Sequence, residues 1–394
     1  MYTGPNIVKD NTLLYFDTGS IKSYKGEPTT NFSLYSDILK SVTNGNQYNG
    51  QFYYNLATVY KTNNISPIRT SNAYLINMSG SSYDLYSAYT GLTVGSTYTF
   101  SIYVKLGSAT NFTIVPNNTA GWNTVTGGTV FTGLSKDKYI RVSITFIAPS
   151  GGSVNIHLGG HSESITQQSA GSLYLWGHQF ELNSHPTNYL STSSSTSLRT
   201  STQGLVPLLS QKKTSLDLTN MSHDTNSNLT FNGTTNNIKI SDSVYNRTTG
   251  NELTICTVIK PGRNAGQYQD IVVNRSDSLY NWMLFQHTTD GSIQLHGSAQ
   301  NKSTYIPTIG KYIHVTATVT STGVYTLYIN GVVKQTVTGY TYANMSPSLL
   351  CIGCFGSGQE PYLGKIDVVK IHTRALTQAE VVKDYNAIKS RFNI

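Results

Sequence analysis

The clearest structural signals of this chain lie between Lys311 and Arg391. This stretch begins KYIHVTATVTSTGVYTLYINGVV and, after a Gly-rich loop, ends GKIDVVKIHTRALTQAEVVKDYNAIKSR. Apolar side chains alternate with threonine over residues 315–320, and the alternation returns over residues 325–329. A period of two predicts strands, and its alternation with polar residues predicts a sheet with one buried face.

A turn and a further strand complete this part of the sheet. Asn330-Gly331 supplies the pair of positive φ angles that a tight hairpin needs. Residues 332–333 are therefore predicted to fold back on the strand before them. Residues 364–371 alternate again and predict one more strand.

A helix is predicted to close the chain. Thr377 is a suitable N-cap, and Glu380 three residues later completes a capping box. The residues that follow give the helix one apolar stripe at three- to four-residue spacing, formed by Val381, Tyr385, Ile388 and Phe392.

The composition is that of a β-rich protein with two domains. At 394 residues the chain is long enough for two cores, and 38% of it is hydrophobic while only 12% is charged. Short alternating runs separated by Gly, Ser, Asn and Pro predict an all-β fold of two jelly-roll sandwiches rather than βαβ units. The net charge is +8, but the sequence contains no run of basic residues longer than Lys212-Lys213. This argues against nucleic acid as a partner.

The three cysteines, Cys256, Cys351 and Cys354, do not make a disulfide framework, because their number is odd and their spacing is uneven. The CxxC at 351–354 lacks the second pair that a zinc site needs, so all three are predicted as buried apolar residues. The chain begins without a basic and apolar leader, and no window reaches transmembrane length. We therefore expect neither export nor insertion into a membrane.

Four segments follow from the pattern. Residues 1–72 are the least regular and are predicted as an N-terminal segment, either an edge region packed on the first domain or an assembly arm. Residues 73–190 contain five alternating runs and predict the first jelly roll. Residues 191–203 are rich in Ser and Thr and predict a linker, and residues 204–394 form the second domain.

The second domain resembles the LamG-like, concanavalin A-type jelly rolls. The strings YINGVV, GKIDVVKIHTRAL and TQAEVVKDYNAIKSRF carry the resemblance, together with LTICTVIKP and FNGTTNNIKI upstream. Val258 and Tyr312 stand where many members of that family have Trp. The first domain, through GLTVGSTYTFSIYVK and LYLWGHQFELNSHPTNYL, is similar to carbohydrate-binding modules of tailed-phage structural proteins. These resemblances imply two β-sandwiches and a place on a virion surface.

No motif indicates catalysis. Glucanases on the concanavalin scaffold carry Glu-x-Asp-x-x-Glu, because an acid and a nucleophile must flank the scissile bond. That string is absent, and Glu360, Asp367 and Glu380 lie apart in the sequence. His157 and His161 resemble metal ligands only superficially, since a strand does not bring them to one face as a helix would.

Calcium is the one ion that the resemblance implies. Jelly rolls of this type often hold calcium through oxygen ligands, and the candidate ligands at strand ends are Asp242, Asp270, Asp277 and Asp290. Their spacing identifies no binding loop, and isolated Asp residues in turns are the ordinary alternative. We expect no cofactor other than such a structural ion.

Glycan binding is the main functional prediction. Sugars stack on Tyr or Trp while amides and carboxylates bind their hydroxyls. The aromatic residues in or beside predicted turns are Trp122, Tyr268, Tyr280, Trp282, Tyr340, Tyr342 and Tyr362. Packing or protein contact is the alternative for each of them. Trp176 lies inside an alternating run and is predicted as core.

We therefore predict a non-enzymatic surface protein of a tailed-phage virion, made in the host cytoplasm, that decorates the capsid or forms a short head fibre. Its partners would be other virion proteins, copies of itself in a symmetric oligomer, and cell-surface glycans that it binds weakly. The alternatives are a tail- or baseplate-associated receptor-binding adhesin and a bacterial surface glycan-binding protein. A depolymerising enzyme would need a second carboxylate facing a cleft aromatic.

Overall fold

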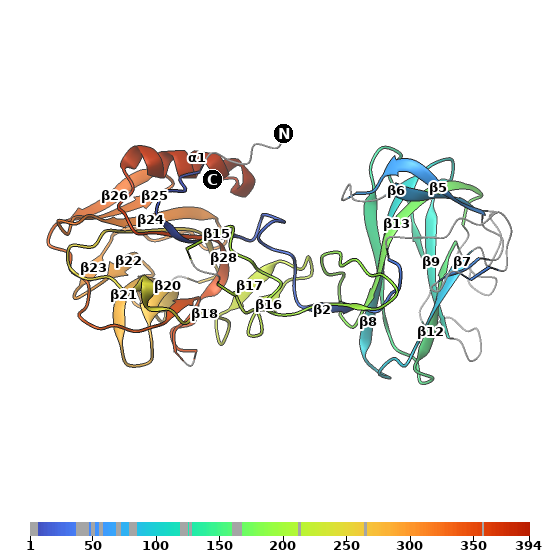
Figure 1. Cartoon of the computed structure of the whole chain (residues 1–394), viewed down its shortest axis with the longest axis horizontal. Coiled ribbons are helices and arrows are strands. Elements are labelled where there is room, and N and C mark those ends of the chain that lie inside the picture. Colours follow the sequence, from blue (N-terminus) through green and yellow to red (C-terminus); the bar gives the residue numbers. More distant parts are fainter. Residues whose placement is uncertain are drawn as a thin grey trace. The chain divides into compact units, whose positions relative to one another are not determined.

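The computed structural model describes residues 7–36, 47–48, 52–54, 58–67, 72–78, 85–118, 125, 128–159, 168–211, 214–263, 266–356 and 358–394. The chain divides into two compact units (Figure 1). The C-terminal unit contains the chain up to Pro28, Thr200–Asp224 and Asn228–Ile394, and the inserted unit contains Thr29–Arg199 and Thr225–Ser227. The inserted unit therefore interrupts the chain of the C-terminal unit, and each unit has its own hydrophobic core.

The larger sheet of the C-terminal unit, here called the helix-side sheet, is antiparallel. Its strands follow the order β15-β1-β28-β19-β24-β25-β26. The bounds are β1 (Thr12–Asp17), β15 (Leu209–Ser210), β19 (Leu253–Pro261), β24 (Ile313–Val319), β25 (Tyr325–Ile329), β26 (Val332–Val337) and β28 (Leu363–His372). At one end of β28, β17 (Leu229–Asn232) pairs with it, and β16 (Ser222–His223) pairs with β17.

The second sheet of this unit is here called the open-face sheet. It has the order β18-β27-β20-β21-β22-β23. The bounds are β18 (Ile238–Ile240), β20 (Gln269–Arg275), β21 (Tyr280–Gln286), β22 (Ile293–His296), β23 (Gln300–Lys302) and β27 (Leu350–Ile352), and the 3-10 helix η1 (Ser243–Tyr245) follows β18. Alternate residues of both sheets face inward and enclose one core, as in a β-sandwich.

The local signals in residues 311–391 act as predicted. Asn330 and Gly331 have φ angles of 50° and 77°, which is the hairpin turn between β25 and β26. Thr377 caps the helix, and its side chain and that of Glu380 form the capping box. The prediction of one buried face is wrong for β24, whose seven residues are all buried. The reason is that a helix packs on the second face.

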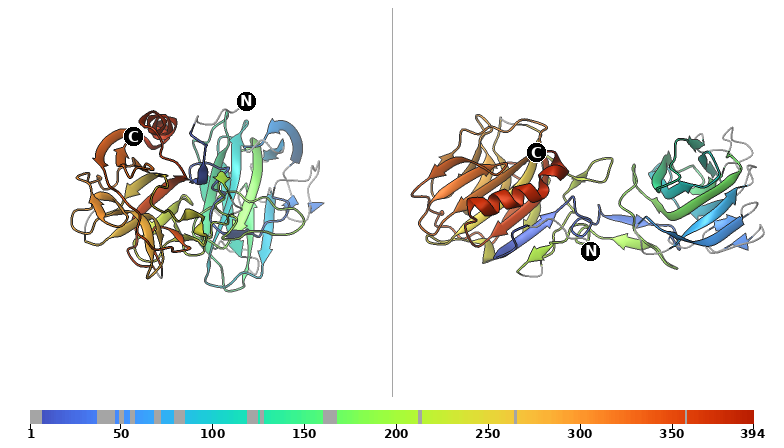
Figure 2. Two further views of the ribbon diagram at one scale, coloured as in Figure 1. Left: turned by 60° about the vertical axis from the view of Figure 1, so that its left-hand side comes forward. Right: turned by 90° about the horizontal axis from the view of Figure 1, so that it is seen from above.

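That helix, α1 (Gln378–Phe392), lies on the outer face of the helix-side sheet (Figures 1 and 2). Val381 packs against Cys256 of β19 and Tyr328 of β25, and Ile388 packs in a second cluster with Tyr15 of β1. The open-face sheet lies on the other side of the helix-side sheet from α1 (Figure 1). Within the described residues, no helix has the length and apolarity that crossing a membrane requires.

The inserted unit is a second antiparallel sandwich. One sheet has the order β10-β9-β12-β7-β4-β3 and the other β11-β8-β13-β6-β5, while β2 (Thr29–Asn31) pairs with β14 (Ser197–Arg199). The remaining bounds are β3 (Gln47–Tyr48), β4 (Phe52–Tyr54), β5 (Thr58–Ile65), β6 (Asn72–Met78), β7 (Leu85–Thr90), β8 (Thr97–Leu106), β9 (Phe112–Asn118), β10 (Thr129–Phe131), β11 (Ile140–Ile147), β12 (Ser153–Leu158) and β13 (Gly171–Glu181). Trp176 is 2% exposed, as predicted for a core residue.

The all-β fold class is confirmed, but the units differ from the predicted segments. Residues 1–72 are not one segment, because β1 lies between β15 and β28 whereas β2 to β5 belong to the inserted unit. The six residues of β1 are all buried, which makes this strand part of the sandwich rather than an arm. The predicted linker 191–203 contains β14, whose backbone pairs with β2.

Candidate functional site

The outer face of the open-face sheet is the candidate site. Inward residues such as Val272 and Leu284 belong to the main core. The outward side carries a separate apolar cluster, formed by Val273, Met283, Phe285, Cys351 and Phe355, with Tyr268, Tyr280 and Leu349 packed against it. Among the described residues, no helix lies on this face, so its half-buried rim residues are available for contact with other molecules.

Five rings form a continuous series on this face, here called the ring row: Tyr268, Tyr280, Phe285, His287 and His296. The ring of His287 lies edge-on to Tyr268 with centroids 5.3 Å apart, and Tyr268 lies 5.7 Å from Phe285. Phe285 lies 6.3 Å from His296, which lies 5.3 Å from Tyr280. Because Phe285 is only 2% exposed, it is the floor between two half-buried Tyr–His pairs.

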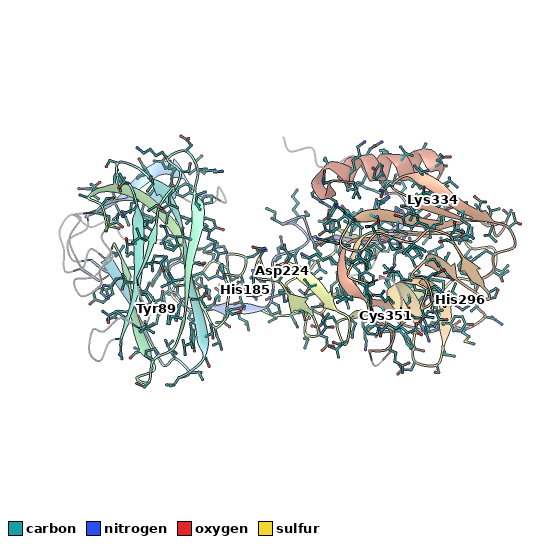
Figure 3. All side chains as sticks on the ribbon, turned by 180° about the vertical axis from the view of Figure 1, so that it is seen from behind. Tyr89, His185, Asp224, His296, Lys334 and Cys351 are labelled. Atoms are coloured by element: carbon teal, nitrogen blue, oxygen red, sulfur yellow. The ribbon has the colours of Figure 1, made fainter. Side chains whose placement is uncertain are left out.

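The strand register brings these rings to one face. Met283 of β21 pairs with Val273 of β20 on one side and with His296 of β22 on the other. Residues directly opposite one another in a sheet share a face, so the three strands present a common surface. In Figure 3, His296 and Cys351 lie on the opposite side of the unit from α1 and Lys334. From Tyr280 to His287 the row follows β21 for roughly 23 Å.

A charged pair borders the ring row beside Tyr280. Nη1 of Arg275 donates to Oε2 of Glu360 at 3.0 Å, and the guanidinium lies 3.4 Å from the centre of the Phe355 ring. Glu360 has a φ of 52°, a left-handed backbone conformation that is uncommon for a residue with a side chain. The side chains of Arg275 and Glu360 are 20% and 26% exposed, so they can still bind a ligand's polar groups.

Asp270 lies beneath this pair and is fully buried. Its backbone N–H donates to the carbonyl oxygen of Glu360 at 2.9 Å. Burial raises the pKa of Asp270 well above its usual value, the carboxylate of Glu360 raises it further, and Arg275 lowers it. The uncharged acid is therefore the favoured form of Asp270, while the side chain of Glu360 pairs with Arg275.

The imidazole of His296 in the ring row is favoured in its neutral form near pH 7. Burial lowers the pKa of His296, and the nearby guanidinium of Arg275 lowers it further. The backbone N–H of Thr289 donates to Nδ1 of His287 at 3.3 Å, which leaves Nε2 as the ring nitrogen that can donate to a ligand. The site thus combines aromatic faces with N–H donors, which suits sugar rings and their hydroxyls.

Two of the predicted glycan-binding residues, Tyr268 and Tyr280, belong to the ring row. The prediction is wrong for Trp282 and Tyr362, which are fully buried in the main core. The indole N–H of Trp282 donates to the carbonyl oxygen of Tyr245 at 2.9 Å, and the ring has no exposed face on which a sugar could stack.

The remaining predicted aromatic residues do not stack on ligands either. Tyr340 and Tyr342 are 4% and 6% exposed, and their rings pack against each other at 5.4 Å in the main core. The prediction is therefore wrong for them as stacking surfaces. Trp122 lies outside the described residues, as does His161 of the superficial metal motif.

The four Asp residues predicted as calcium ligands do not come together. Asp242 accepts the N–H of Val244 and caps η1, and Asp290 accepts the N–H of Ser292. Asp270 lies under Glu360, and Asp277 lies in the turn before β21. Among the described residues, no three of these four form a group of donors, whereas calcium takes six to eight oxygens. These residues therefore do not fit one calcium site.

One trio of metal-binding residue types lies beneath α1. Donor atoms of Cys256, His372 and Asp384 lie within 4.8 Å of one another, and all three residues are buried. Nζ of Lys370 donates to Oδ2 of Asp384, and the backbone N–H of Val8 donates to Oδ1 at 2.7 Å. Since the ammonium group already balances the charge of Asp384, we interpret the trio as part of a polar anchor for α1 rather than as a metal centre.

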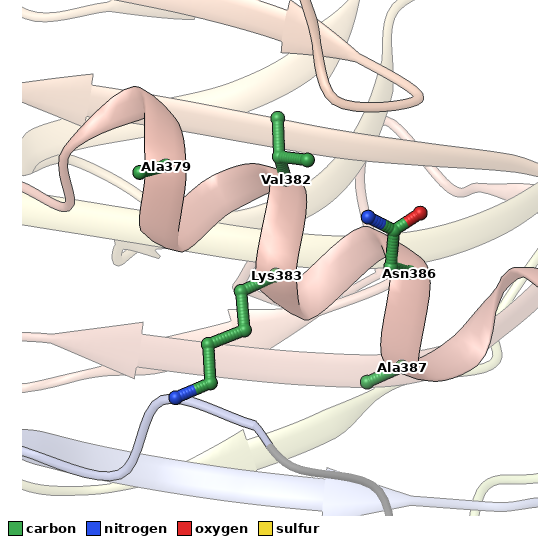
Figure 4. A pocket seen from close by; sticks show the side chains of 5 residues that line it. All are labelled: Ala379, Val382, Lys383, Asn386 and Ala387. Atoms are coloured by element: carbon green, nitrogen blue, oxygen red, sulfur yellow. The ribbon is translucent and has the colours of Figure 1, made fainter.

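A hollow of about 520 Å³ lies along the outward side of α1 (Figure 4). Its lining within the described residues is short and contains neither an aromatic ring nor a carboxylate: Ala379, Val382, Lys383, Asn386 and Ala387. This lining has none of the groups by which proteins bind sugars, so the hollow is not part of the candidate site.

Sequence reasoning missed five residues of the site: Phe285, His287, His296, Arg275 and Glu360. His287 and His296 stand at the ends of readable strands, and counting the period of two from Met283 and Phe285 would have placed His287 on the outward face. Arg275 could have been found in the same way, because it ends β20. Glu360 has no such signal, since the loop before β28 brings it to Arg275 from 85 positions away.

Comparison with a known protein family concerns the C-terminal unit. Residues 232–382 match a family described as the concanavalin A-like lectin/glucanases superfamily. The matched stretch contains the whole open-face sheet and the ring row, and on the helix-side sheet it extends from β19 through β28. This part of the chain therefore has a concanavalin A-like sandwich. No curated protein sequence matches the chain.

Several solved structures are similar to part of this chain at low identity. Domain 4 of AbnA, an extracellular arabinanase from Geobacillus stearothermophilus solved with arabinotriose, is 17% identical over 44% of this chain and 82% of that one, with a TM-score of 0.34. The binding domain of botulinum neurotoxin serotype D is 15% identical over 48% of this chain, with a TM-score of 0.36. A Trypanosoma rangeli sialidase is 13% identical over 48%, with a TM-score of 0.38. The matches span 49% of the neurotoxin domain and 31% of the sialidase.

Proposed function

We propose that this protein binds glycans without cleaving them and that the ring row is its binding site. The observation that carries the proposal is the continuous series of Tyr, His and Phe rings on a sheet face without a covering helix among the described residues. Aromatic faces stack on the apolar side of sugars, while Arg275, Glu360 and the imidazole N–H groups bind hydroxyls. Because the row follows β21 over several residues, a chain of sugars suits it better than a single unit.

The acidic residues support binding rather than catalysis. The family that matches residues 232–382 includes lectins and glucanases alike, so the choice depends on the carboxyl groups at the site. A glycosidase needs two carboxyl groups that both reach the scissile bond. Asp270 is fully buried, and Glu360 is paired with Arg275, so neither group is placed to act on a sugar in the ring row.

The proposed setting is the surface of a tailed-phage virion, as a head decoration or short head fibre. The support is the resemblance of both halves of the sequence to domains of phage structural proteins. A single glycan site of this kind binds near millimolar, about −4 kcal/mol, so it becomes useful only when many copies act together. A tail-associated receptor-binding adhesin is the alternative, and it would use the same residues.

Glycan binding is tested with Tyr280→Ala and Tyr268→Ala, assayed by titration with oligosaccharides released from bacterial surfaces. Each variant should weaken binding about tenfold, because it removes one stacking surface of the row. Tyr60→Ala is the matched control, since Tyr60 is an exposed tyrosine of the inserted unit. Equal binding by all three variants would refute the ring row as the site. Release of reducing sugar ends by the wild type would refute the non-enzymatic assignment.

The proposed setting needs a separate measurement. Antibodies against residues 204–394 should label purified virions over the head in immunogold micrographs. Label confined to the tail end would favour the adhesin. Absence of label from every particle would refute a virion protein and leave a free or cell-surface glycan-binding protein, with the ring-row titration unaffected.

A further inference from the structure

A second hollow lies at one end of the sandwich of the C-terminal unit. Three loops line it: residues 249–251 before β19, residues 319–323 around the turn from β24 to β25, and residues 339–342 after β26. Its volume is about 170 Å³, the space of roughly five to six water molecules. This rim pocket shares no residue with the ring row, and its size suits one sugar ring rather than a chain.

Hydrogen bonds between the loops hold the rim pocket in shape. The hydroxyl of Tyr342 donates to the carbonyl oxygen of Asn251 at 3.1 Å, which ties the third loop to the first. The N–H of Tyr340 donates to the carbonyl oxygen of Gly323 at 2.9 Å, which ties the third loop to the second. Because these bonds exist before any ligand binds, little ordering is needed on binding, and that favours affinity for a small ligand.

The chemistry of the lining selects an uncharged ligand. The residues that line the rim pocket include Thr249 and Ser321, whose side chains carry hydroxyl groups, together with the loop glycines, and none of the lining residues is charged. The hydroxyl of Thr341 is already bonded to that of Ser298. Tyr340 and Tyr342 supply an apolar aromatic wall. An anionic ligand would lose its hydration here without meeting a cation, which is unfavourable, whereas a polyol finds both hydroxyl partners and an apolar surface.

We propose that the rim pocket binds a single neutral sugar unit, or another small uncharged polyol, independently of the ring row. A terminal sugar of a glycan and a free polyol share this chemistry. Tyr340 and Tyr342, which the sequence singles out and which cannot serve as stacking surfaces, would then contribute as the wall of this pocket.

The test is titration of the ¹⁵N-labelled full chain with methyl glycosides of neutral hexoses, followed through the backbone amide signals of Gly250, Gly323 and Gly339. These signals should shift with a dissociation constant near millimolar. The matching uronic acids should bind at least about tenfold more weakly, because the lining lacks a cation. A free polyol such as glycerol, titrated in parallel, shows whether the sugar ring itself is required.

Two variants separate the rim pocket from the rest of the surface. Ser321→Tyr and, from the opposite wall, Thr249→Tyr should each weaken hexose binding about tenfold by filling the pocket. Thr308→Tyr is the matched control. Thr308 lies in the turn before β24 and Ser321 in the turn after it, so the two residues are at opposite ends of that strand. Tyr280→Ala should leave the glycine shifts unchanged, so failure of the ring row does not affect this result. No glycine shift up to roughly 100 mM glycoside, or binding that both pocket-filling variants retain, would overturn the proposal.

Discussion

The strand face on which a residue lies determines whether it packs in the core or can contact a ligand. Tyr280 and Trp282 are two positions apart on β21 and would share a face in a regular strand. The pairing of β20 with β21 shifts register between Asn274 and Arg275, however. As a result Tyr280 packs with the outer cluster whereas Trp282 is buried in the core, and only the first can meet a ligand.

The buried carboxyl of Asp270 makes stability depend on pH in a defined direction. Burial and Glu360 raise the pKa of Asp270 above the usual 3.8, so the folded state holds this proton at pH values where the unfolded state has lost it. The stabilisation is present below pH 3.8 and is lost as the pH rises through the raised pKa. Asp270→Asn should therefore increase the free energy of unfolding at pH 7 to 8, measured with urea.

The same variant tests the alternative of a bound cation at Asp270. Asp277→Asn is the control, because it makes the same chemical change at an exposed residue. If Asp270 binds no cation, calcium should change the melting temperature of the wild type and of Asp270→Asn by the same amount. A calcium-dependent rise that Asp270→Asn abolishes would contradict the neutral-acid interpretation.

His314 makes stability depend on pH in the opposite direction. Burial lowers its pKa from 6.5 to about 4, with Asp384 opposing and Lys370 adding to the shift. Between pH 6.5 and 4, His314 therefore binds a proton in the unfolded state but not in the folded state. The free energy of unfolding decreases as the pH falls through this range. For one such group the loss at pH 4 is about 3 kcal/mol.

His314→Leu isolates that contribution. The wild type and the variant should show parallel free energies of unfolding between pH 7 and 8, and the wild type should fall more steeply below pH 6. His372, whose pKa burial also lowers to about 4, remains in both proteins and cancels in the comparison. Profiles that stay parallel down to pH 4 would show that His314 is already protonated in the folded state.

At the scale of elements, α1 is attached to its sheet by apolar contacts and by one buried ion pair. Lys370 of β28 and Asp384 of α1 are both nearly inaccessible, with side chains 4% and 3% exposed. Asp384 also accepts the N–H of Val8, so the segment before β1, the sheet and the helix meet at this carboxylate. A buried pair of this kind stabilises little in total, but removing one partner leaves an unpaired charge.

Asp384→Ala should therefore destabilise the C-terminal unit by about 3–5 kcal/mol, because Lys370 would remain buried and charged. The double variant Lys370→Met with Asp384→Leu should recover most of that loss, since it replaces the pair with apolar groups of similar size. Urea unfolding followed by circular dichroism measures both. If the single change costs less than about 1 kcal/mol, the pair is hydrated and does not anchor the helix.

At the scale of the molecule, the C-terminal unit is assembled from the two ends of the described chain. β1 lies between β15 and β28, and Nη1 of Arg391 near the end of α1 donates to Oδ2 of Asp17 at 2.8 Å. The chain leaves this unit after Pro28 and returns at Thr200, and there Thr29 pairs with Arg199 in neighbouring strands. The two points of exit and entry are therefore close in space.

Excision of residues 29–199 should leave a folded C-terminal unit when Pro28 is joined to Thr200 by a Gly/Ser linker of about four residues. The expected product is monodisperse, rich in strand by circular dichroism, and as active as the full chain at the ring row. Deletion of residues 1–72 should instead abolish folding of this unit, because it removes β1 from inside the helix-side sheet. A soluble, cooperatively folding deletion of 1–72 would restore the idea of a separable assembly arm.

Local signals in the sequence predicted those parts of the structure that depend on neighbouring residues. The hairpin at Asn330-Gly331, the capping box of Thr377 and Glu380, and the strands around them follow from backbone preferences and period-two burial, which act over a few positions. The core position of Trp176 was readable for the same reason. The β-sandwich was predicted from the family resemblance, because members of that family contain these local signals in the same order along the chain.

Contacts between residues far apart in the chain could be seen only in the folded molecule. β1 joins β28 from more than 340 positions away, Glu360 reaches Arg275 through a loop, and a register shift buries Trp282 while leaving Tyr280 at the surface. None of these has a local signal, because pairing partners and loop paths are chosen by the burial of the whole sandwich. The ring row therefore became visible only when β20, β21 and β22 were placed side by side.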